Sequence, residues 1–314
     1  MTRPRPSTRR ILLWGLLALA VLVVVLNWTY GRLPATPRPT GRFLQLAGLK
    51  IRYLERSGPG PAVLLIHGLP GTAEDFEAVT PLIKGHRTIA IDRPGYGFST
   101  GGYFPFDRQL QAVHEVIEKL HLGHPILVGH SYGGAISLAY AERHPSEVRG
   151  LVLVDAAATC TRNSAFARAQ ARFVKLVELP VVSQVANATF SQLLRTASAD
   201  PAESEAFSPN GVNQRHHQRV LAINLKHGNL EAYSGETVAA NGVIEALDRG
   251  LHGIQQPAIV LQGAQDKLVK PECGRRLAAS LPDAHLQMVQ GGHMVPYTHP
   301  AAVAAAVEAL ARQR

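Results

Sequence analysis

Short apolar runs alternate with amphipathic stretches along the chain from residue 61 onward. Six of these runs predict strands, of which the first two read as buried, over 61–68, 87–92, 124–129, 148–156, 257–263 and 285–290. Apolar residues at helical spacing predict helices over 106–121, 135–143, 271–281 and from about residue 300. Strands and helices that alternate in this way are typical of a mostly parallel sheet covered by helices on both faces. We therefore expect an α/β fold.

One long segment interrupts this alternation. Residues 158–255 contain no strand run of that kind, but they hold helical stretches such as 165–177 and 215–226. A segment of this length is too long for a connecting loop. We expect 42–157 and 256–314 to form one core, with 158–255 as a helical subdomain inserted between two strands of its sheet.

The chain before the first buried strand has its own pattern. Residues 31–41 contain three prolines and no apolar run, which predicts a stiff linker. Residues 42–55 form two alternating segments around Ala47 and Gly48, which predicts a β-hairpin.

The N-terminal segment resembles a membrane anchor. Residues 11–26 are apolar throughout, and Trp28 and Tyr30 end the run. As a helix, residues 11–30 span about 30 Å, which matches the hydrocarbon core of a bilayer. Arginines precede the run, so we expect residues 1–10 in the cytoplasm and the domain on the outer side of the membrane, periplasmic or extracellular.

A cleaved signal peptide is the alternative for this segment. No small-x-small cleavage site follows the apolar run, since Asn27, Trp28, Thr29 and Tyr30 include bulky residues. This absence favours an uncleaved anchor. Thr8 to Arg10 faintly resembles a twin-arginine export signal, but arginines that flank an anchor are the interpretation we prefer.

Most of the net positive charge comes from the same end of the chain. The net charge is +9, seven arginines lie within the first 42 residues, and no acidic residue precedes Glu55. Because the rest of the chain is close to neutral, we exclude nucleic-acid binding.

Cys160 and Cys273 are the two cysteines and have no zinc-site spacing. A disulfide between them and two free thiols both remain open.

A serine between two glycines stands where a predicted strand becomes a helix. The motif is Gly129-His130-Ser131-Tyr132-Gly133, which fits G-x-S-x-G. The glycines allow a tight turn that exposes the serine hydroxyl at the carboxyl edge of the sheet. There the N-terminus of the next helix favours developing negative charge. This arrangement predicts a nucleophilic Ser131.

A serine nucleophile needs a base and a carboxylate that orients the base. His293 follows the last predicted strand, and Asp266 follows the strand before it. Both therefore lie at the same sheet edge as Ser131. Asp155, at the end of an earlier strand, competes for the role of the acid. We favour Asp266 because its short polar turn lets the carboxylate reach the loop that carries His293.

Two further motifs complete a family resemblance. "HGLPG" over 67–71 is similar to an HGxP loop, and "DRPGYGFS" over 92–99 is similar to another signature of the same family. Together with the serine motif, they resemble the α/β-hydrolase superfamily across the core. The resemblance implies that the backbone N–H groups of Leu69 and Tyr132 form the oxyanion hole. It also implies that the inserted segment is a helical cap.

Other polar residues near these motifs have structural interpretations. We expect His67 and His130 to brace the oxyanion loop and the serine turn through hydrogen bonds, and Asp92 and Arg93 to pin loops beneath the site. The histidine-rich run over 215–219 suggests a metal site, but a solvated face of the cap is the interpretation we prefer.

The serine also narrows the reaction. Epoxide hydrolases and haloalkane dehalogenases share the HGxP loop but carry aspartate at the nucleophile position. Proline iminopeptidases have a motif similar to GGSWG at this turn, where this chain has GHSYG. We therefore expect a membrane-anchored serine hydrolase that cleaves a small, fairly apolar acyl ester, without cofactor or metal. A carbon–carbon bond hydrolase, a perhydrolase and a non-catalytic binding protein are the alternatives.

Overall fold

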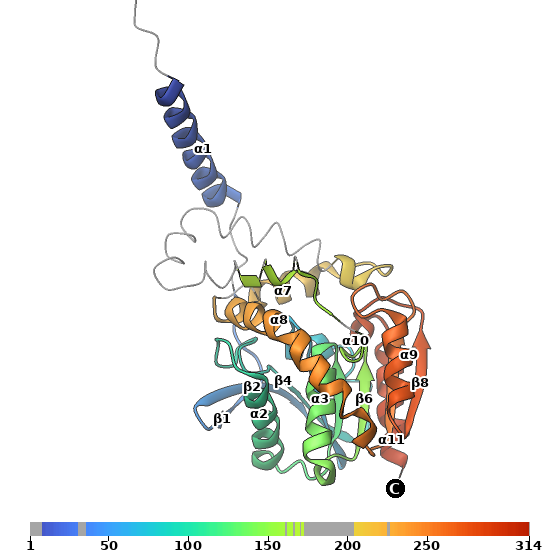
Figure 1. The fold of residues 1–314 in the computed structure, drawn as a ribbon. Helices are drawn as coiled ribbons and strands as arrows, with labels where there is room; N and C mark the ends of the chain where they lie inside the picture. The colour runs from blue at the N-terminus through green and yellow to red at the C-terminus, as the bar shows by residue number, and fades with distance from the viewer. Residues whose placement is uncertain are drawn as a thin grey trace, which may run out of the picture.

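One mixed sheet forms the centre of the computed structural model (Figure 1). The structure describes residues 8–30, 36–160, 162–165, 167–169, 171–172, 204–224 and 227–313. The strands within these ranges are β1 (Arg42–Leu46), β2 (Leu49–Arg56), β3 (Gly60–Ile66), β4 (His86–Ile91), β5 (Ile126–His130), β6 (Gly150–Val154), β7 (Ala258–Gly263) and β8 (Ala284–Val289). Their order is β1-β2-β4-β3-β5-β6-β7-β8. The hairpin β1–β2 joins β4 in antiparallel register, and every pair from β4 to β8 is parallel.

Helices cover both faces of the sheet. The α-helices whose bounds fall within the described residues are α1 (Thr8–Tyr30), α2 (Phe106–Lys119), α3 (Tyr132–Arg143), α7 (Gln214–Asn224), α8 (His227–Asp248), α9 (Pro271–Ser280), α10 (Val295–Thr298) and α11 (Pro300–Arg312). Short 3-10 turns occur at η1 (Ala73–Phe76), η2 (Pro145–Glu147) and η3 (Leu251–Gly253). Alternate residues of each central strand pack to opposite sides. One side contacts α2, α3 and α9, and the other contacts α11 and η1.

The predicted strands and helices agree closely with this fold. Each of the six predicted strands and four predicted helices is present, and the ends shift by up to three residues. The hairpin also forms, with Leu46 opposite Leu49 and Gly48 at a φ of 70° in its turn. The strands could be recognised because β3 to β7 are buried on both faces, which requires continuous apolar runs.

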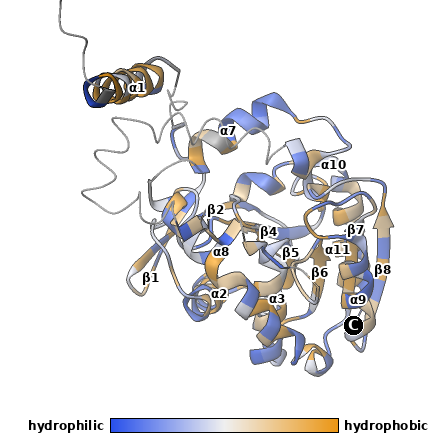
Figure 2. Cartoon of the chain, turned by 45° about the horizontal axis from the view of Figure 1, so that its top comes forward, coloured by the Kyte–Doolittle hydropathy of each residue, from blue (hydrophilic) through white to orange (hydrophobic). Residues whose placement is uncertain are grey.

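Helix α1 lies apart from the core (Figure 2), and it exposes large apolar side chains along its length from Ile11 to Trp28. Its span Arg9–Thr29 has a mean hydropathy of 2.5 over its most apolar window, of which 6% is buried. This helix is long and apolar enough to be a membrane anchor or a signal sequence. Residues 1–7 and the first part of the predicted linker, 31–35, lie outside the described residues.

The described part of the inserted segment is helical. Helix α7 lies beyond the carboxyl ends of β6 and β8, where the arrowheads point (Figure 1). Helix α8 packs on α3. The predicted stretch 165–177 lies only partly within the described residues. One expectation is wrong: His216 and His217 are buried, at 2% and 7% exposure, instead of facing solvent. The ring of His216 packs 4.4 Å from that of Tyr297 in the core.

Candidate active site

Ser131 occupies the sharp turn between β5 and α3. Its backbone has φ 53° and ψ −121°, a conformation that residues other than glycine rarely adopt. Hydrogen bonds from its neighbours hold the turn: its N–H donates to the Val154 carbonyl, and its carbonyl accepts from Gly134 and Ala157, each at 2.9 Å. The hydroxyl-bearing side chain thereby projects from the carboxyl edge of the sheet. Tyr132 begins α3, where backbone N–H groups have no partner within the helix.

The small residues around this turn are required by close contacts. A Cβ on Gly133 would lie 2.0 Å from the Ile66 carbonyl oxygen, and one on Gly129 would lie 2.5 Å from that of Gly133. A Cβ on Gly68 would lie 2.8 Å from Ser131 Cβ and 3.4 Å from its Oγ. The loop that carries Leu69 is therefore pressed directly against the serine side chain.

His293 and Asp266 meet across the ends of β8 and β7. His293 Nδ1 lies 2.8 Å from Asp266 Oδ2, and both side chains are buried. Asp266 Oδ1 accepts the backbone N–H groups of Leu268 and Val269, at 2.8 and 3.0 Å. Although burial alone would raise the pKa of Asp266, His293 and these N–H groups hold it below its usual value. The turn thus keeps an ionised carboxylate against the imidazole.

Asp155 occupies a different environment at the end of β6. Its Oδ1 accepts the Gly263 N–H at 2.7 Å and the Gln262 amide at 3.1 Å. Burial and the charge of Asp266 hold the pKa of Asp155 well above its usual value. Two carboxyl groups whose environments drive their pKa values apart serve different purposes.

His130 ties the serine turn to the histidine loop. Its Nε2 donates to the carbonyl of His293 at 2.9 Å, and the two rings pack 4.9 Å apart. Burial, together with the nearby His293, lowers the pKa of His130 to about 3. His130 is therefore neutral at physiological pH, as a hydrogen-bonding brace requires.

Asp92 fixes two loops beneath the site. Its carboxylate accepts the backbone N–H groups of Ala73 and Phe98, each at 2.8 Å. A Cβ on Gly97, where φ is 58°, would lie 2.2 Å from that carboxylate. The glycine within "DRPGYGFS" is therefore needed for the loop to fold back onto Asp92.

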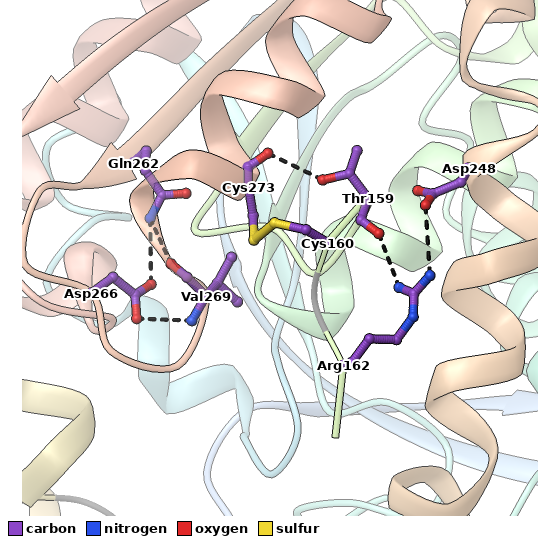
Figure 3. The surroundings of a disulfide bond; sticks show 8 residues. All are labelled: Thr159, Cys160, Arg162, Asp248, Gln262, Asp266, Val269 and Cys273. Carbon is purple, nitrogen blue, oxygen red and sulfur yellow. Dashed lines mark hydrogen bonds and ion pairs between the residues drawn. A yellow bond between two sulfur atoms is a disulfide. The ribbon is translucent and has the colours of Figure 1, made fainter. Parts of the chain in front are cut away.

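A disulfide joins the start of the inserted segment to α9 (Figure 3). Cys160 and Cys273 are 113 residues apart in sequence, with 5.3 Å between their Cα atoms. Beside them, the Thr159 hydroxyl donates to the Cys273 carbonyl at 3.2 Å. The bond fixes the polypeptide after β6 next to the helix that follows the Asp266 turn.

Two polar residues of the site were missed in the sequence. Gln262 stands within β7, and its amide donates to Asp155 and to the Val269 carbonyl at 3.1 and 3.0 Å. A glutamine in an otherwise apolar strand was the available signal. Glu236 lies on α8 and is buried against the core. No local pattern identifies it, because its partners are more than 120 residues away.

A family model described as the alpha/beta hydrolase fold matches residues 61–300. The chain belongs to the α/β-hydrolase family. Lipase 1 of Psychrobacter immobilis is 27% identical to this α/β-hydrolase over 255 residues, 80% of this chain and 76% of the lipase. The 2-hydroxymuconate semialdehyde hydrolase of Pseudomonas sp. strain CF600 is 26% identical over 292 residues, 87% of this chain and 94% of the relative.

The solved structures support the same fold. An α/β-hydrolase fold protein from Burkholderia ambifaria superimposes with a TM-score of 0.72 at 21% identity, over 85% of this chain and 96% of that protein. Because the chain belongs to this family and its relatives include a lipase and another hydrolase, it is an enzyme of the hydrolase class.

Proposed function

We propose that this enzyme cleaves a small, fairly apolar acyl ester through a covalent acyl-enzyme on Ser131. The observation that carries the proposal is the arrangement at one sheet edge. Ser131 stands on a strained turn with the Leu69 loop against its side chain, and the same turn is braced to the loop in which His293 contacts Asp266. Nucleophile, base and orienting carboxylate are the groups that acyl transfer needs.

Each residue has a defined part in the proposed reaction. His293 takes the proton from the Ser131 hydroxyl as the oxygen attacks the carbonyl carbon, and Asp266 holds the imidazole in the tautomer with Nδ1 protonated. The N–H groups of Leu69 and Tyr132 stabilise the oxyanion. His293 then protonates the leaving alcohol. Water, deprotonated by the same histidine, hydrolyses the acyl-enzyme and regenerates Ser131.

The inserted segment, 158–255, is the proposed cap over this edge. Its residue Ala206 accepts the backbone N–H groups of His293 and Met294, at 2.9 and 3.2 Å. A segment in direct contact with the histidine loop is suited to shape the space above the serine. Lipase 1 of Psychrobacter immobilis supports an ester as the substrate class.

Carbon–carbon bond hydrolysis on the same residues is the second candidate. It is favoured by the 2-hydroxymuconate semialdehyde hydrolase, which aligns with 87% of this chain. We expect the purified enzyme to hydrolyse short p-nitrophenyl esters and to leave a vinylogous diketone intact. Release of p-nitrophenolate measures ester hydrolysis. Loss of the absorbance of the diketone's dienol form measures carbon–carbon cleavage. Preferential turnover of the diketone would reverse the assignment.

We also propose that α1 anchors the enzyme with its catalytic domain outside the cytoplasmic membrane. The arginines before α1 and the apolar span support this orientation. The Cys160–Cys273 disulfide supports it independently, since disulfides persist in oxidising compartments.

Membrane retention gives a direct test of this location. We expect the full-length chain to remain in the membrane fraction after a carbonate wash, and protease added to spheroplasts to digest the domain. A cytoplasmic marker protein in the same sample should stay intact. A soluble mature protein that begins near residue 30 would instead identify α1 as a cleaved signal sequence.

A further inference from the structure

A carboxylate from the inserted segment lies buried behind the loop that carries Leu69. Glu236, on α8, is 2% exposed. Its oxygens accept from Arg93 Nη1 and Nη2 at 2.8 and 3.0 Å. They also accept from the Tyr96 hydroxyl and the Gln109 amide, each at 2.9 Å. Glu236 is thus held by hydrogen bonds from three groups of the core, one of them a bidentate guanidinium.

Close packing brings α8 to this position. A Cβ on Gly235 would lie 2.2 Å from the ring of Tyr103, so only glycine fits beside Glu236. A second contact joins the backbone of Gly102 to Gly228 through an N–H···O bond of 3.1 Å. The N-terminal half of α8 is therefore seated on the loop after β4.

Arg93 extends from Glu236 to the oxyanion loop. Its Nη2 donates to the Gly68 carbonyl at 2.8 Å, and its Nε donates to the His67 carbonyl at 3.0 Å. The Gly68 carbonyl also lies 2.9 Å from His67 Nδ1. Because the Arg93 backbone N–H donates to His67 Nε2 at 2.9 Å, that nitrogen is the acceptor and Nδ1 carries the proton. The Gly68 oxygen therefore accepts two hydrogen bonds.

The Gly68 oxygen and the Leu69 N–H belong to the same peptide group. The bond between these residues is trans, since the cis bond of this loop follows Leu69. In a planar trans peptide, the C=O and N–H point in opposite directions. When Arg93 fixes the Gly68 oxygen, it therefore also fixes the direction of the Leu69 N–H, which points the opposite way. A charged donor on the oxygen also polarises the peptide and strengthens its N–H as a donor.

We propose that Glu236 is a positioning residue, through which the inserted segment sets the direction of the Leu69 N–H by way of Arg93. This inference rests on the proposed serine mechanism. An oxyanion donor stabilises the transition state only if it is already aimed at the developing charge. Without the carboxylate, the buried Arg93 guanidinium loses its counter-ion, and its hold on the Gly68 carbonyl is no longer fixed.

Glu236→Gln in the full-length enzyme tests this role. We expect kcat per active site to fall about 10- to 100-fold, less than for outright loss of an oxyanion donor, with little change in KM. Active sites are counted by fluorophosphonate labelling to completion. The affinity for a trifluoromethyl ketone, which forms an oxyanion on the serine, should fall by a similar factor.

The matched control is Glu245→Gln, which makes the same change at an exposed position of α8. It should keep wild-type kcat, KM and trifluoromethyl ketone affinity. Wild-type kcat in a folded Glu236→Gln enzyme overturns the positioning role, and so does a variant in which only KM changes. If that variant does not fold, Arg93→Lys serves instead, because a lysine lacks the planar fork that joins Glu236 to both carbonyls. Wild-type kcat in Arg93→Lys likewise overturns it.

Failure of the proposed mechanism gives a different result. Ester turnover that persists in Ser131→Ala refutes the serine mechanism itself. Turnover that requires Ser131 but is indifferent to Glu236 refutes only the positioning role.

Discussion

Ser131→Ala is expected to lower kcat for p-nitrophenyl esters by about 10⁴- to 10⁶-fold and to eliminate fluorophosphonate labelling. The reason is chemical: without the Oγ no acyl-enzyme forms, and the residual rate comes from the oxyanion donors and substrate binding. Folding should be unaffected, because backbone atoms make the hydrogen bonds that hold the turn. Alanine has the same difficulty as serine at a φ of 53°, so the local strain is nearly unchanged.

Ser137→Ala is the matched control. Ser137 lies on α3, the helix that follows the Ser131 turn, and its hydroxyl donates to the Gly133 carbonyl at 2.9 Å. This variant should be labelled like the wild type, and intact-mass measurement should find one phosphonyl group per chain. Labelling of Ser131→Ala at the wild-type rate would contradict the assignment of the nucleophile. Both variants are compared for thermal unfolding, so that a folding defect is not mistaken for a chemical one.

The sheet and the serine turn could be predicted because both leave local patterns. Strands buried on both faces must be continuously apolar, and a turn as tight as that at Ser131 needs the glycines that stand around it. His293 and Asp266 were predictable for a related reason. Each follows a strand, and parallel neighbours such as β7 and β8 end at the same edge.

The remaining features depend on contacts between distant segments. The burial of His216 results from packing against Tyr297, and the role of Glu236 results from Arg93, 143 residues before it. Helix α8 has no strong apolar face that would identify which side meets the core. A charged residue buried on such a helix is therefore indistinguishable in sequence from an exposed one. The pairing of Cys160 with Cys273 likewise required the fold.

The choice of Asp266 as the proposed triad acid rests on charge as well as distance. A carboxyl oxygen of Asp155 and ring nitrogens of His130 and His293 lie within 4.8 Å of one another, so proximity alone does not exclude Asp155. Asp266, however, contacts His293 Nδ1 at 2.8 Å and has a pKa below its usual value. Burial and the charge of Asp266 raise the pKa of Asp155 well above its usual value, so Asp266 is the more readily ionised of the two carboxyl groups. The carboxyl group that ionises more readily is the better partner for the imidazolium that forms when the serine attacks.

Asp266→Asn should therefore lower kcat about 10⁴-fold, because the asparagine amide favours the imidazole tautomer that cannot accept the serine proton. Asp155→Asn should change kcat by less than about tenfold, since asparagine matches the shape of aspartate and retains the oxygen that accepts the Gly263 N–H. Steady-state kinetics of the two variants, with thermal unfolding measured alongside, decide between the acids. The reverse order of losses would assign the triad acid to Asp155 and leave Ser131 and His293 in their proposed roles.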